Sequence, residues 1–385
     1  MRLLLITNVF PSPRRPTKGT FNRELVAGLR EAGDDVRVVV PVPWTDLLRA
    51  KATGAPERDA SYPVWWFPPR VGRATYHRWM SRSLLAPTVR AARLWAPDLV
   101  LGYWTHPDST VALDLARRLG VPGVVLAGGT DIQLHTRHPA RRRIIVDTLR
   151  AADRVLTVGA ALRDAAIALG VPPNRIGIFD RGVDRQRFFP GAPAAARQRL
   201  GLPSDRPIVL WVGRMVPVKG LDVLLRSWLT VARAPSRPLL LLIGDGDDQR
   251  ALEQQAAGLG DSVRFVGSVE HGALPDWYRA ADCVVLPSRS EGVPNVLLEG
   301  LACGTPFVAS AVGGVGTLVD GESTTVPPED VAALTTALLA RVALPPMSRR
   351  SRVDVPDRRE TIASLRRELQ DVIGNTVRPP VEQLA

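Results

Sequence analysis

The chain has 385 residues, which is long enough for two domains of ordinary size. Hydrophobic residues make up 45% and charged residues 23% of it, and the mean hydropathy is +0.01. This composition excludes disordered and fibrous proteins and indicates a packed core. No apolar run approaches the roughly 18 residues of a membrane helix. Two cysteines, Cys283 and Cys303, are too few for a disulfide framework or a thiolate metal cage, and we expect a cytoplasmic protein.

The net charge is +12 and the sequence pI is about 10.8. Such a balance suits nucleic acid, anionic lipid or phosphorylated substrates as partners. Nearly all the basic residues are arginines, because Lys18, Lys51 and Lys219 are the lysines of the chain. Arginine in place of lysine, with many alanines and prolines, also indicates the codon bias of a GC-rich genome. Both explanations stay open.

In the first half, short apolar runs alternate with helical patterns. Residues 1–7 are interpreted as a buried first strand and not as a secretion signal. The expected strands are Leu3–Thr7, Val36–Val40, Val64–Phe67, Leu99–Tyr103, Val124–Ala127, Arg154–Val158 and Ile176–Phe179. The expected helices are Phe21–Ala32, Thr110–Leu119 and Ala160–Leu169, each followed by or ending near a glycine. This alternation predicts a parallel sheet covered on both faces.

The pattern begins again in the second half. The expected strands are Ile208–Val212, Leu239–Ile243, Val263–Val266, Cys283–Leu286 and Phe307–Ala309, and the expected helices are Leu221–Arg233, Gln249–Leu259 and Pro275–Ala280. A join rich in Pro, Ala and Arg, at residues 182–204, separates the two series. We therefore predict two Rossmann-like doubly wound domains, residues 1–185 and 186–345, with a ligand cleft at the carboxyl ends of their strands.

A last helix is predicted over Asp357–Ile373, with Gly374 as its end. Its apolar residues keep helical spacing and form one stripe, which needs a partner surface.

The most informative segment is Glu291-Gly-Val-Pro-Asn-Val-Leu-Leu-Glu299, which follows a predicted strand. Pro294 suits the first turn of a helix, and free N–H groups at a helix start form an anion site. The two glutamates could be a hydrolase pair. Eight helical residues span about 12 Å, however, whereas such pairs lie about 5 to 9.5 Å apart. The spacing better suits contacts at two ends of a long ligand.

A second segment combines glycine turns with cations. Gly213-Arg214 and Lys219-Gly220 follow the predicted strand Ile208–Val212. Arginine offers fork-shaped hydrogen bonds to a phosphate and lysine a point charge. Surface charge is the alternative, and it is weaker for Lys219 because lysine is rare here.

Two glycine segments are less specific. Gly244-Asp245-Gly246 follows the predicted strand Leu239–Ile243 and could border a base or a ribose, but it lacks the full dinucleotide fingerprint. Lys18-Gly19-Thr20 precedes a predicted helix and could approach a phosphate. A plain tight turn explains the first segment equally well, and for the second segment taken alone a plain turn before the helix is favoured.

Aromatic and basic residues gather between Tyr62 and Met80. They include Trp65, Trp66, Phe67, Tyr76 and Trp79 among Arg70, Arg73 and Arg78, and Arg141-Arg142-Arg143 adds further charge. This mixture suits an anionic membrane surface and a lipid-phosphate acceptor. A core strand beside a solvated basic loop is an equal alternative.

Together these segments make the sequence recognisable. It resembles the family 4 retaining glycosyltransferases of the GT-B fold over residues 1–328, most closely over residues 207–314. The resemblance rests on the Arg214 and Lys219 segment, Gly244-Asp245-Gly246, Val266-Gly267, the paired glutamates and Ala302-Cys303-Gly304-Thr305-Pro306.

The resemblance implies two domains facing each other across a cleft, with the last helix crossing back to the first. Arg214 and Lys219 would hold the donor diphosphate, Glu291 the transferred sugar and Glu299 the ribose. Further donor contacts would come from Gly19, Gly213, Gly244, Gly246, Gly292, Val293, Pro294, Asn295 and Val296. His106, Thr130 and Asp131 are the candidates on the acceptor side. No metal and no cofactor are expected beside the nucleotide-diphosphate sugar.

The sequence departs from the family pattern at several positions. Gly128 stands where a His or Arg is common and often helps place the donor sugar, Gly316-Thr317 replaces Pro-Glu, and Arg181 replaces Asn. The Gly128 departure concerns the first-domain part of the site.

The resemblance implies a metal-independent, retaining glycosyltransferase that moves a sugar from a nucleotide sugar to a saccharide or lipid-linked acceptor. Cell-envelope polysaccharide or glycolipid synthesis is the expected pathway class, with a location in the cytoplasm, peripheral on the inner face of the membrane. A two-domain sugar-nucleotide epimerase and a donor-binding protein with little activity are the alternatives. Nucleic acid is not an expected partner, because the arginines are spread out and no binding module is present.

Overall fold

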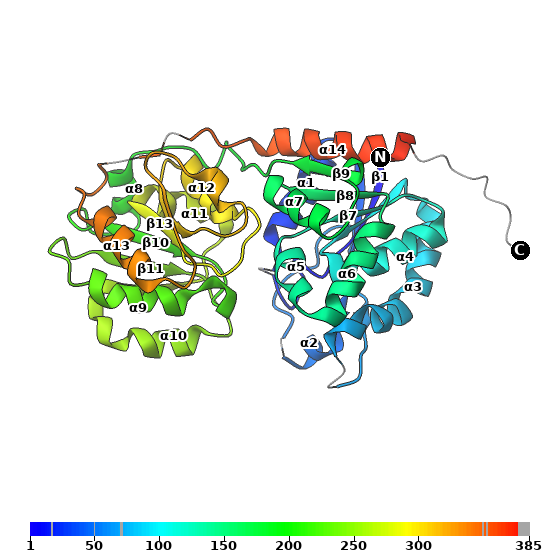
Figure 1. Ribbon diagram of the computed structural model, residues 1–385, viewed down its shortest axis with the longest axis horizontal. Coiled ribbons are helices and arrows are strands. Elements are labelled where there is room, and N and C mark those ends of the chain that lie inside the picture. The colour runs from blue at the N-terminus through cyan, green and yellow to red at the C-terminus, as the bar shows by residue number, and fades with distance from the viewer. Residues whose placement is uncertain (17, 50, 70–71, 349, 352, 376–385) are drawn as a thin grey trace, which may run out of the picture. The chain divides into compact units, whose positions relative to one another are not determined.

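The structure is a computed structural model that describes residues 1–375 except 17, 50, 70, 71, 349 and 352. The chain divides into two compact units. Among the described residues, the first holds Met1–Asp180 and residues 359–375, and the second holds Arg181–Arg358. Each unit is built on a large parallel sheet with helices on both faces, so the predicted pair of doubly wound folds is confirmed (Figure 1). The domain boundary predicted at residues 185 and 186 stays a prediction.

The first unit is built on a seven-stranded parallel sheet. Its strands, from edge to edge, are β4 (Ala60–Ser61), β2 (Asp35–Val39), β1 (Arg2–Ile6), β6 (Leu99–Tyr103), β7 (Gly123–Leu126), β8 (Arg154–Val158) and β9 (Ile176–Phe179). The chain adds β2 and β4 on one side of β1 and then crosses to β6 on its other side. The loops after β1 and β6 therefore flank the point where the strand order reverses, which is where such folds bind ligands.

Helices cover both faces of this sheet because its strands are apolar on both sides. The helices are α1 (Thr20–Glu31), α2 (Trp44–Arg49), α3 (Tyr76–Trp95), α4 (Thr110–Leu119), α5 (Thr130–Gln133), α6 (Pro139–Ala151) and α7 (Ala160–Ala168). Leu4, Val39 and Val100 pack under α3 and α4, whereas Val125 and Val155 pack on the opposite side with residues of α6 and α7.

The aromatic and arginine-rich segment lies at the edge of this unit. A two-stranded sheet joins β3 (Val42–Pro43) to β5 (Val64–Trp65), and the long helix α3 then begins. The sequence patterns did not predict α3. Trp65 is buried and Trp66 is half exposed, while Arg70 lies outside the described residues. The three consecutive arginines at 141–143 belong to helix α6 and not to a loop.

The second unit is built on a six-stranded parallel sheet. From edge to edge it contains β12 (Val263–Gly267), β11 (Leu239–Ile243), β10 (Ile208–Val212), β13 (Cys283–Leu286), β14 (Phe307–Ser310) and β15 (Thr324–Val326). Its helices are α8 (Pro193–Arg199), α9 (Leu221–Val231), α10 (Gln249–Ala256), α11 (Leu274–Ala280), α12 (Asn295–Ala302) and α13 (Val331–Val342). Here the strand order reverses between β10 and β13.

Both faces of the second sheet are buried in hydrophobic clusters. Leu210 and Val284 pack on one side, and Trp211 and Val285, their neighbours along the strands, pack on the other. Alternate side chains of a strand point to opposite faces, which explains why these strands are apolar throughout.

The segment that the sequence suggested as a join is part of the second unit. Helix α8 lies within it, and Arg197 of that helix is 1% exposed. Its Nη2 donates to Asp282 Oδ2 at 2.6 Å, which ties the helix to the start of β13. An arginine-rich composition suggested a loop because sequence alone does not show that one of the arginines is buried and paired.

The last helix, α14 (Arg358–Asn375), packs on the first unit as predicted. Ile362 lies against Gly28 of α1, Arg366 Nε donates to Asp34 Oδ2 at 2.8 Å, and Arg154 Nη2 donates to Glu368 Oε2 at 2.6 Å. The prediction that Gly374 ends this helix is wrong, because the helix continues through it to Asn375.

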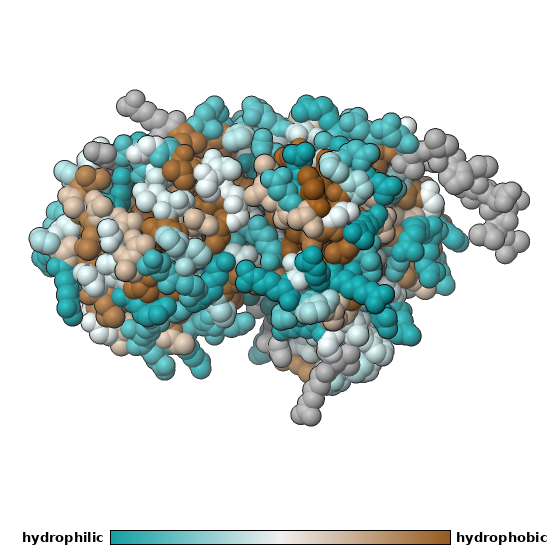
Figure 2. All heavy atoms as spheres, in the orientation of Figure 1, coloured by the Kyte–Doolittle hydropathy of each residue, from teal (hydrophilic) through white to brown (hydrophobic). Residues whose placement is uncertain are grey.

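The surface of each unit mixes residue types. On the face drawn in Figure 2, hydrophilic residues surround separate hydrophobic patches in both units. Among the described residues, no helix is both long and apolar enough to cross a membrane.

Candidate functional site

The loops after β10 and β13 bring two predicted site residues together. Lys219 Nζ lies 2.6 Å from Glu291 Oε1, although 72 residues separate them along the chain. Ser288 Oγ donates to the same oxygen at 2.6 Å. Glu291 is 8% exposed and Ser288 is fully buried. Adjacent parallel strands explain this meeting, because their carboxyl ends open at the same edge of the sheet.

Glycines allow these loops to pack closely. Gly220 has a φ of 66°, and a Cβ there would lie 2.0 Å from the carbonyl oxygen of Pro287. Gly244 has a φ of 126°, and a Cβ there would lie 1.8 Å from the carbonyl oxygen of Gly213. A side chain would push the loops apart at either position.

The Gly244–Gly246 turn therefore supports the cationic loop. The backbone N–H of Met215 donates to the carbonyl of Asp245 at 2.6 Å, and a Cβ on Gly246 would lie 2.2 Å from the carbonyl oxygen of Met215. Arg214, between these contacts, is exposed. Within the described residues its guanidinium has no ion pair or hydrogen bond.

The loop between β13 and α12 ends in an open helix start. Pro294 occupies the N-cap position, one residue before the helix begins. The N–H groups of Asn295 and Val296 have no intrahelical acceptor, because no helical turn precedes them. Gly314 N donates to Gly292 O at 2.7 Å, which anchors the loop. The arrangement offers fixed N–H dipoles next to Glu291, as an anion site requires.

Glu299 is held by residues that the sequence patterns did not single out. Tyr278 Oη donates to its Oε2 at 2.7 Å, and His271 Nε2 lies 2.8 Å from its Oε1. Burial, with the charge of Glu299 as a further cause, raises the pKa of Tyr278 well above its ordinary value. His271 in turn packs on Phe188, with 5.1 Å between ring centroids. These partners lie 21 and 28 residues from Glu299, and no local pattern marks them.

The reversal point of the first unit is held together by Asp108, which is fully buried. Asn8 N and Asn8 Nδ2 donate to its two carboxylate oxygens, each at 2.8 Å, and Lys18 Nζ donates to Asn8 Oδ1 at 3.2 Å. Burial raises the pKa of Asp108 to about 7. Gly19 has a φ of 70°, and a Cβ there would lie 2.3 Å from the carbonyl oxygen of Val9. Asp108 and Gly19 thus shape the loop after β1.

Asp131 has a structural role similar to that of Asp108. It is fully buried, and its carboxylate accepts hydrogen bonds from Thr105 N and Oγ1 at 2.8 Å and from Gly129 N at 2.8 Å. It therefore joins the loops after β6 and β7. A contact of His106, Thr130 or Asp131 with an acceptor stays a prediction.

Trp104 occupies the space beside Gly128. A Cβ on Gly128 would lie 2.6 Å from the Trp104 ring, and Trp104 has a φ of 79°, which is rare for a residue with a side chain. Glycine at position 128 is thus explained by the neighbouring ring, which fills the room that a His or Arg would need.

A groove in the first unit is lined by arginines. It has a volume of about 750 Å³ and lies along α4 and α6, near the start of α3. Arg78, Arg117 and Arg143 line it, and Asp147 is the acid among the lining residues. Within the described part of the chain, Arg78 and Arg143 have no ion pair, whereas Arg117 pairs with Asp114. The groove has an excess of positive charge and suits an anionic ligand.

Beside this groove His77 and His106 form a pair. His77 Nδ1 lies 3.2 Å from His106 Nε2. Burial and the neighbouring His77 lower the pKa of His106 to about 3, and burial also lowers the pKa of His77. Both rings are therefore neutral at pH 7.

Comparison with known families accounts for both units. Residues 19–182 match the glycosyl transferase 4-like domain, and residues 206–343 match the glycosyl transferases group 1. A D-inositol 3-phosphate glycosyltransferase from Thermomonospora curvata is 38% identical over 89% of this chain and 77% of its own length. The chain belongs to the family 4 glycosyltransferases.

Some relatives are matched over less of their length. The alignments cover 48% and 59% of the D-inositol 3-phosphate glycosyltransferases from Catenulispora acidiphila and Frankia alni, at 40% and 37% identity. These alignments span 49% and 57% of this glycosyltransferase-family chain.

Solved structures show the same fold. The sucrose-phosphate synthase from Thermosynechococcus elongatus superposes with a TM-score of 0.71 at 22% identity, over 97% of this chain and 94% of that one. Anabaena HepE, in complex with UDP and glucose, gives a TM-score of 0.66 at 20% identity, over 96% and 94%. The predicted GT-B fold is confirmed.

Proposed function

We propose that this protein transfers a sugar from a nucleotide-sugar donor to an acceptor with retention of configuration. The contact between Lys219 and Glu291 carries the proposal. It places a cation and a carboxylate at the reversal point of the second sheet, beside the open start of α12. A diphosphate needs the cation and the N–H dipoles, and a sugar needs the carboxylate.

Arg214 and Lys219 would hold the donor diphosphate. Arg214 is exposed and available for a fork-shaped contact, while Lys219 supplies a point charge. The backbone from Gly292 to Val296 would add N–H groups. The UDP bound by the Anabaena neighbour supports a nucleotide donor. A diphosphate contact of Gly19 stays a prediction.

Glu299 would receive the ribose hydroxyls. Its carboxylate is fixed by Tyr278 and His271, and each oxygen retains a lone pair for a further donor. Glu291 would orient the transferred sugar, because Lys219 and Ser288 both engage its Oε1 and hold the side chain in place.

The proposed reaction breaks the bond between the anomeric carbon and the diphosphate oxygen and forms a bond to the acceptor oxygen on the same face. The acceptor proton passes to a diphosphate oxygen. Negative charge grows on the leaving diphosphate, so fixed cations and N–H dipoles stabilise the transition state more than the ground state. No metal takes part in this scheme.

The acceptor would bind in the first unit and carry an anionic group. The excess charge of Arg78 and Arg143 supports this part of the proposal. Relatives named for D-inositol 3-phosphate make this compound the first acceptor to test. Saccharides and lipid-linked phosphates are the other acceptors to test.

We also propose that the protein lies in the cytoplasm and associates peripherally with an anionic membrane. Half-exposed Trp66 packs edge-on against Trp79, and the Arg82 guanidinium lies 5.4 Å from the Trp79 ring centroid. Aromatic rings and cations suit the interface of such a membrane.

The alternatives have less support. The relatives are named as glycosyltransferases and one structural neighbour as a synthase, which argues against a sugar-nucleotide epimerase. A donor-binding protein with little activity is the second alternative, and the transfer assay below separates it from an enzyme.

A panel of UDP-, GDP- and ADP-sugars would test the proposal. Donors that raise the melting temperature would be incubated with D-inositol 3-phosphate or glycan acceptors, and the anomeric configuration of the product would be determined by NMR. We expect one donor class to be transferred with retention. Glu291→Gln should lower kcat by about 10²-fold because the sugar loses its orientation, whereas Glu253→Gln, an exposed glutamate on α10, should not. Equal activity of the two variants would defeat the assignment.

A further inference from the structure

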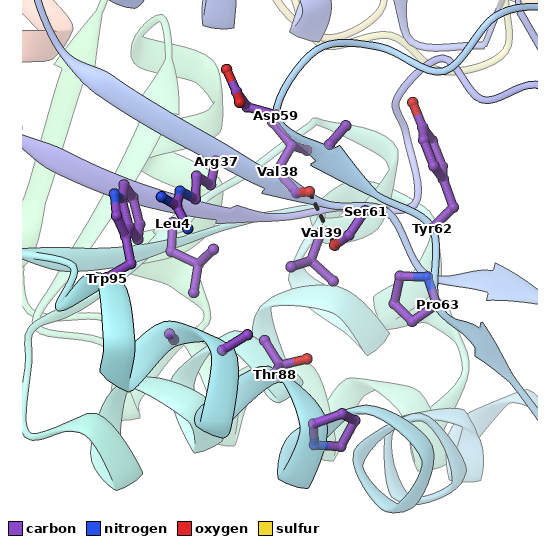
Figure 3. A pocket seen from close by; sticks show the side chains of 14 residues that line it. Leu4, Arg37, Val38, Val39, Asp59, Ser61, Tyr62, Pro63, Thr88 and Trp95 are labelled. Carbon is purple, nitrogen blue, oxygen red and sulfur yellow. Dashed lines mark hydrogen bonds between the residues drawn. The ribbon is translucent and has the colours of Figure 1, made fainter.

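A second cavity lies in the first unit, away from the residues of the candidate site. It has a volume of about 610 Å³ and lies between strands β1, β2 and β4 and the second half of helix α3 (Figure 3). It shares no lining residue with the arginine-lined groove or with the loops at the reversal point. Its volume falls within the range of about 300–1,000 Å³ that small-molecule sites occupy.

The cavity exists because α3 presents small residues to the sheet at this point. Earlier in the helix, Leu84 and Leu85 fill the space against the strands. Two turns later, Ala91 and Ala92 face Leu4 and Val39 across a gap. An array of short side chains opposite an apolar sheet leaves room for a foreign hydrocarbon.

The two ends of the cavity differ. The Trp95 ring stands at one end and Pro63 at the other, as Figure 3 shows. The Arg37 guanidinium lies over the Trp95 ring, 4.6 Å from its centroid. The acids nearby already have partners: Trp95 Nε1 donates to Asp35 Oδ2 at 2.7 Å, and Asp59 pairs with Arg58 at 3.2 Å. In the described part of the protein, Arg37 has no ion pair of its own.

The outer side of α3 is cationic and partly apolar. Arg82, Arg90 and Arg93 are exposed, and none forms an ion pair with a described residue. Leu94, on the flank of the helix that also carries Ala91, is 90% exposed. Uncompensated arginines next to an exposed leucine complement a negatively charged lipid surface.

We propose that this cavity binds one hydrocarbon chain of an anionic membrane lipid. The chain lies between α3 and the sheet, and the anionic headgroup lies near Arg37. The apolar lining supplies the hydrophobic gain and the unpaired guanidinium supplies a contact for the charge. The site would hold the first unit on a lipid independently of donor and acceptor binding.

The test uses cis-parinaric acid, a fatty acid whose fluorescence rises in an apolar site. The wild type should show a saturable rise in fluorescence. Ala91→Phe fills the cavity and should weaken binding about tenfold or more. Ala86→Phe adds the same ring to an exposed position of α3 that does not line the cavity, and should leave the affinity within about twofold. Equal binding by Ala91→Phe and the wild type, or equal losses in both variants, would overturn the proposal.

Two additions keep the test decisive. If Ala91→Phe shows a lower melting temperature, Thr88→Phe fills the same cavity from the neighbouring turn and is expected to weaken binding equally. Arg37→Gln should weaken the binding of cis-parinaric acid about threefold or more. It should leave the binding of methyl parinarate, the uncharged ester, unaffected. Equal losses for acid and ester, or none for the acid, would contradict a headgroup contact with Arg37.

Vesicles identify the source of the chain. Co-sedimentation with phosphatidylglycerol vesicles should exceed that with phosphatidylcholine vesicles, and Ala91→Phe should lower it. Binding that depends on headgroup charge but not on Ala91 would contradict a chain in the cavity.

Discussion

The two sheets reverse their strand order in the same way, yet the polar residues at the two reversal points are used differently. In the second unit Arg214 is exposed and the start of α12 is open, while Lys219 and Ser288 share one oxygen of Glu291. In the first unit Asp108 and Asp131 are fully buried, and their carboxylates accept hydrogen bonds from neighbouring loops. Glu291 keeps 8% exposure, whereas the two aspartates have none. We propose that this remaining exposure lets Glu291 meet a ligand, while the aspartates only build the loops.

Removing the Lys219 ammonium group of the second unit should have the largest effect on activity. Lys219→Ala should lower kcat by about 10²–10³-fold, because the leaving diphosphate loses a fixed charge in the transition state. Steady-state kinetics with the donor that the nucleotide-sugar panel selects would measure the loss. Lys51→Ala, an exposed lysine in the first unit, is the matched control. Similar kcat values for the two variants would remove the functional contrast between the units.

Removing Asp131 should affect stability. Asp131→Ala leaves Thr105 and the Gly128–Gly129 amides without an acceptor, so the free energy of unfolding should fall by about 3 kcal/mol. Urea unfolding would measure the loss. Donor binding to the folded variant serves as the control, because the proposed donor site lies in the second unit. The donor Kd should stay within about twofold of the wild-type value. Wild-type stability would show that Asp131 does not hold these loops.

The neutral histidine pair should make the first unit sensitive to acid. Burial and His77 lower the pKa of His106 to about 3, with Arg141 and His135 acting in the same direction. Between that value and the unfolded value of about 6.5, the unfolded state binds a proton that the folded state does not, so stability falls as the pH falls.

From pH 7.5 to pH 5 the loss should be about 2 kcal/mol. Urea unfolding at pH 7.5, 6.5 and 5 would measure it, and His106→Gln should reduce the dependence. An unchanged dependence in the variant would assign the acid sensitivity to other groups.

The smallest effect is expected at Tyr278. Tyr278→Phe removes one hydrogen bond to the Glu299 carboxylate and should raise the donor Kd about tenfold, with little change in kcat at saturating donor. Calorimetric titration would measure the Kd. In a Glu299→Gln background the same change should have a much smaller effect, because the charged acceptor is gone. An undiminished rise in the donor Kd in the Glu299→Gln background would show that Tyr278 does not act on the donor through Glu299.

Much of the fold could be predicted from local sequence patterns. Strands such as Leu99–Tyr103 and Ile208–Val212 were predicted with their observed bounds, because an apolar run between turn residues is a local signal. Helix α3 was missed, since it contains Pro87, which sequence rules disfavour inside a helix, and its aromatic start suggested a strand or loop. The burial of Arg197 was missed because its partner Asp282 lies 85 residues away.

The sequence by itself determined which chemical groups follow the strands: glycines where loops must pack, and Arg214, Lys219, Glu291 and Glu299 in the second unit. These follow from short-range rules of backbone geometry and charge. The tertiary structure alone decided which acids are hydrogen-bonded within the protein, which residues hold Glu299, and where small side chains leave a cavity. Such outcomes depend on contacts between residues far apart in the chain, such as Asn8 with Asp108, and a one-dimensional pattern does not contain them.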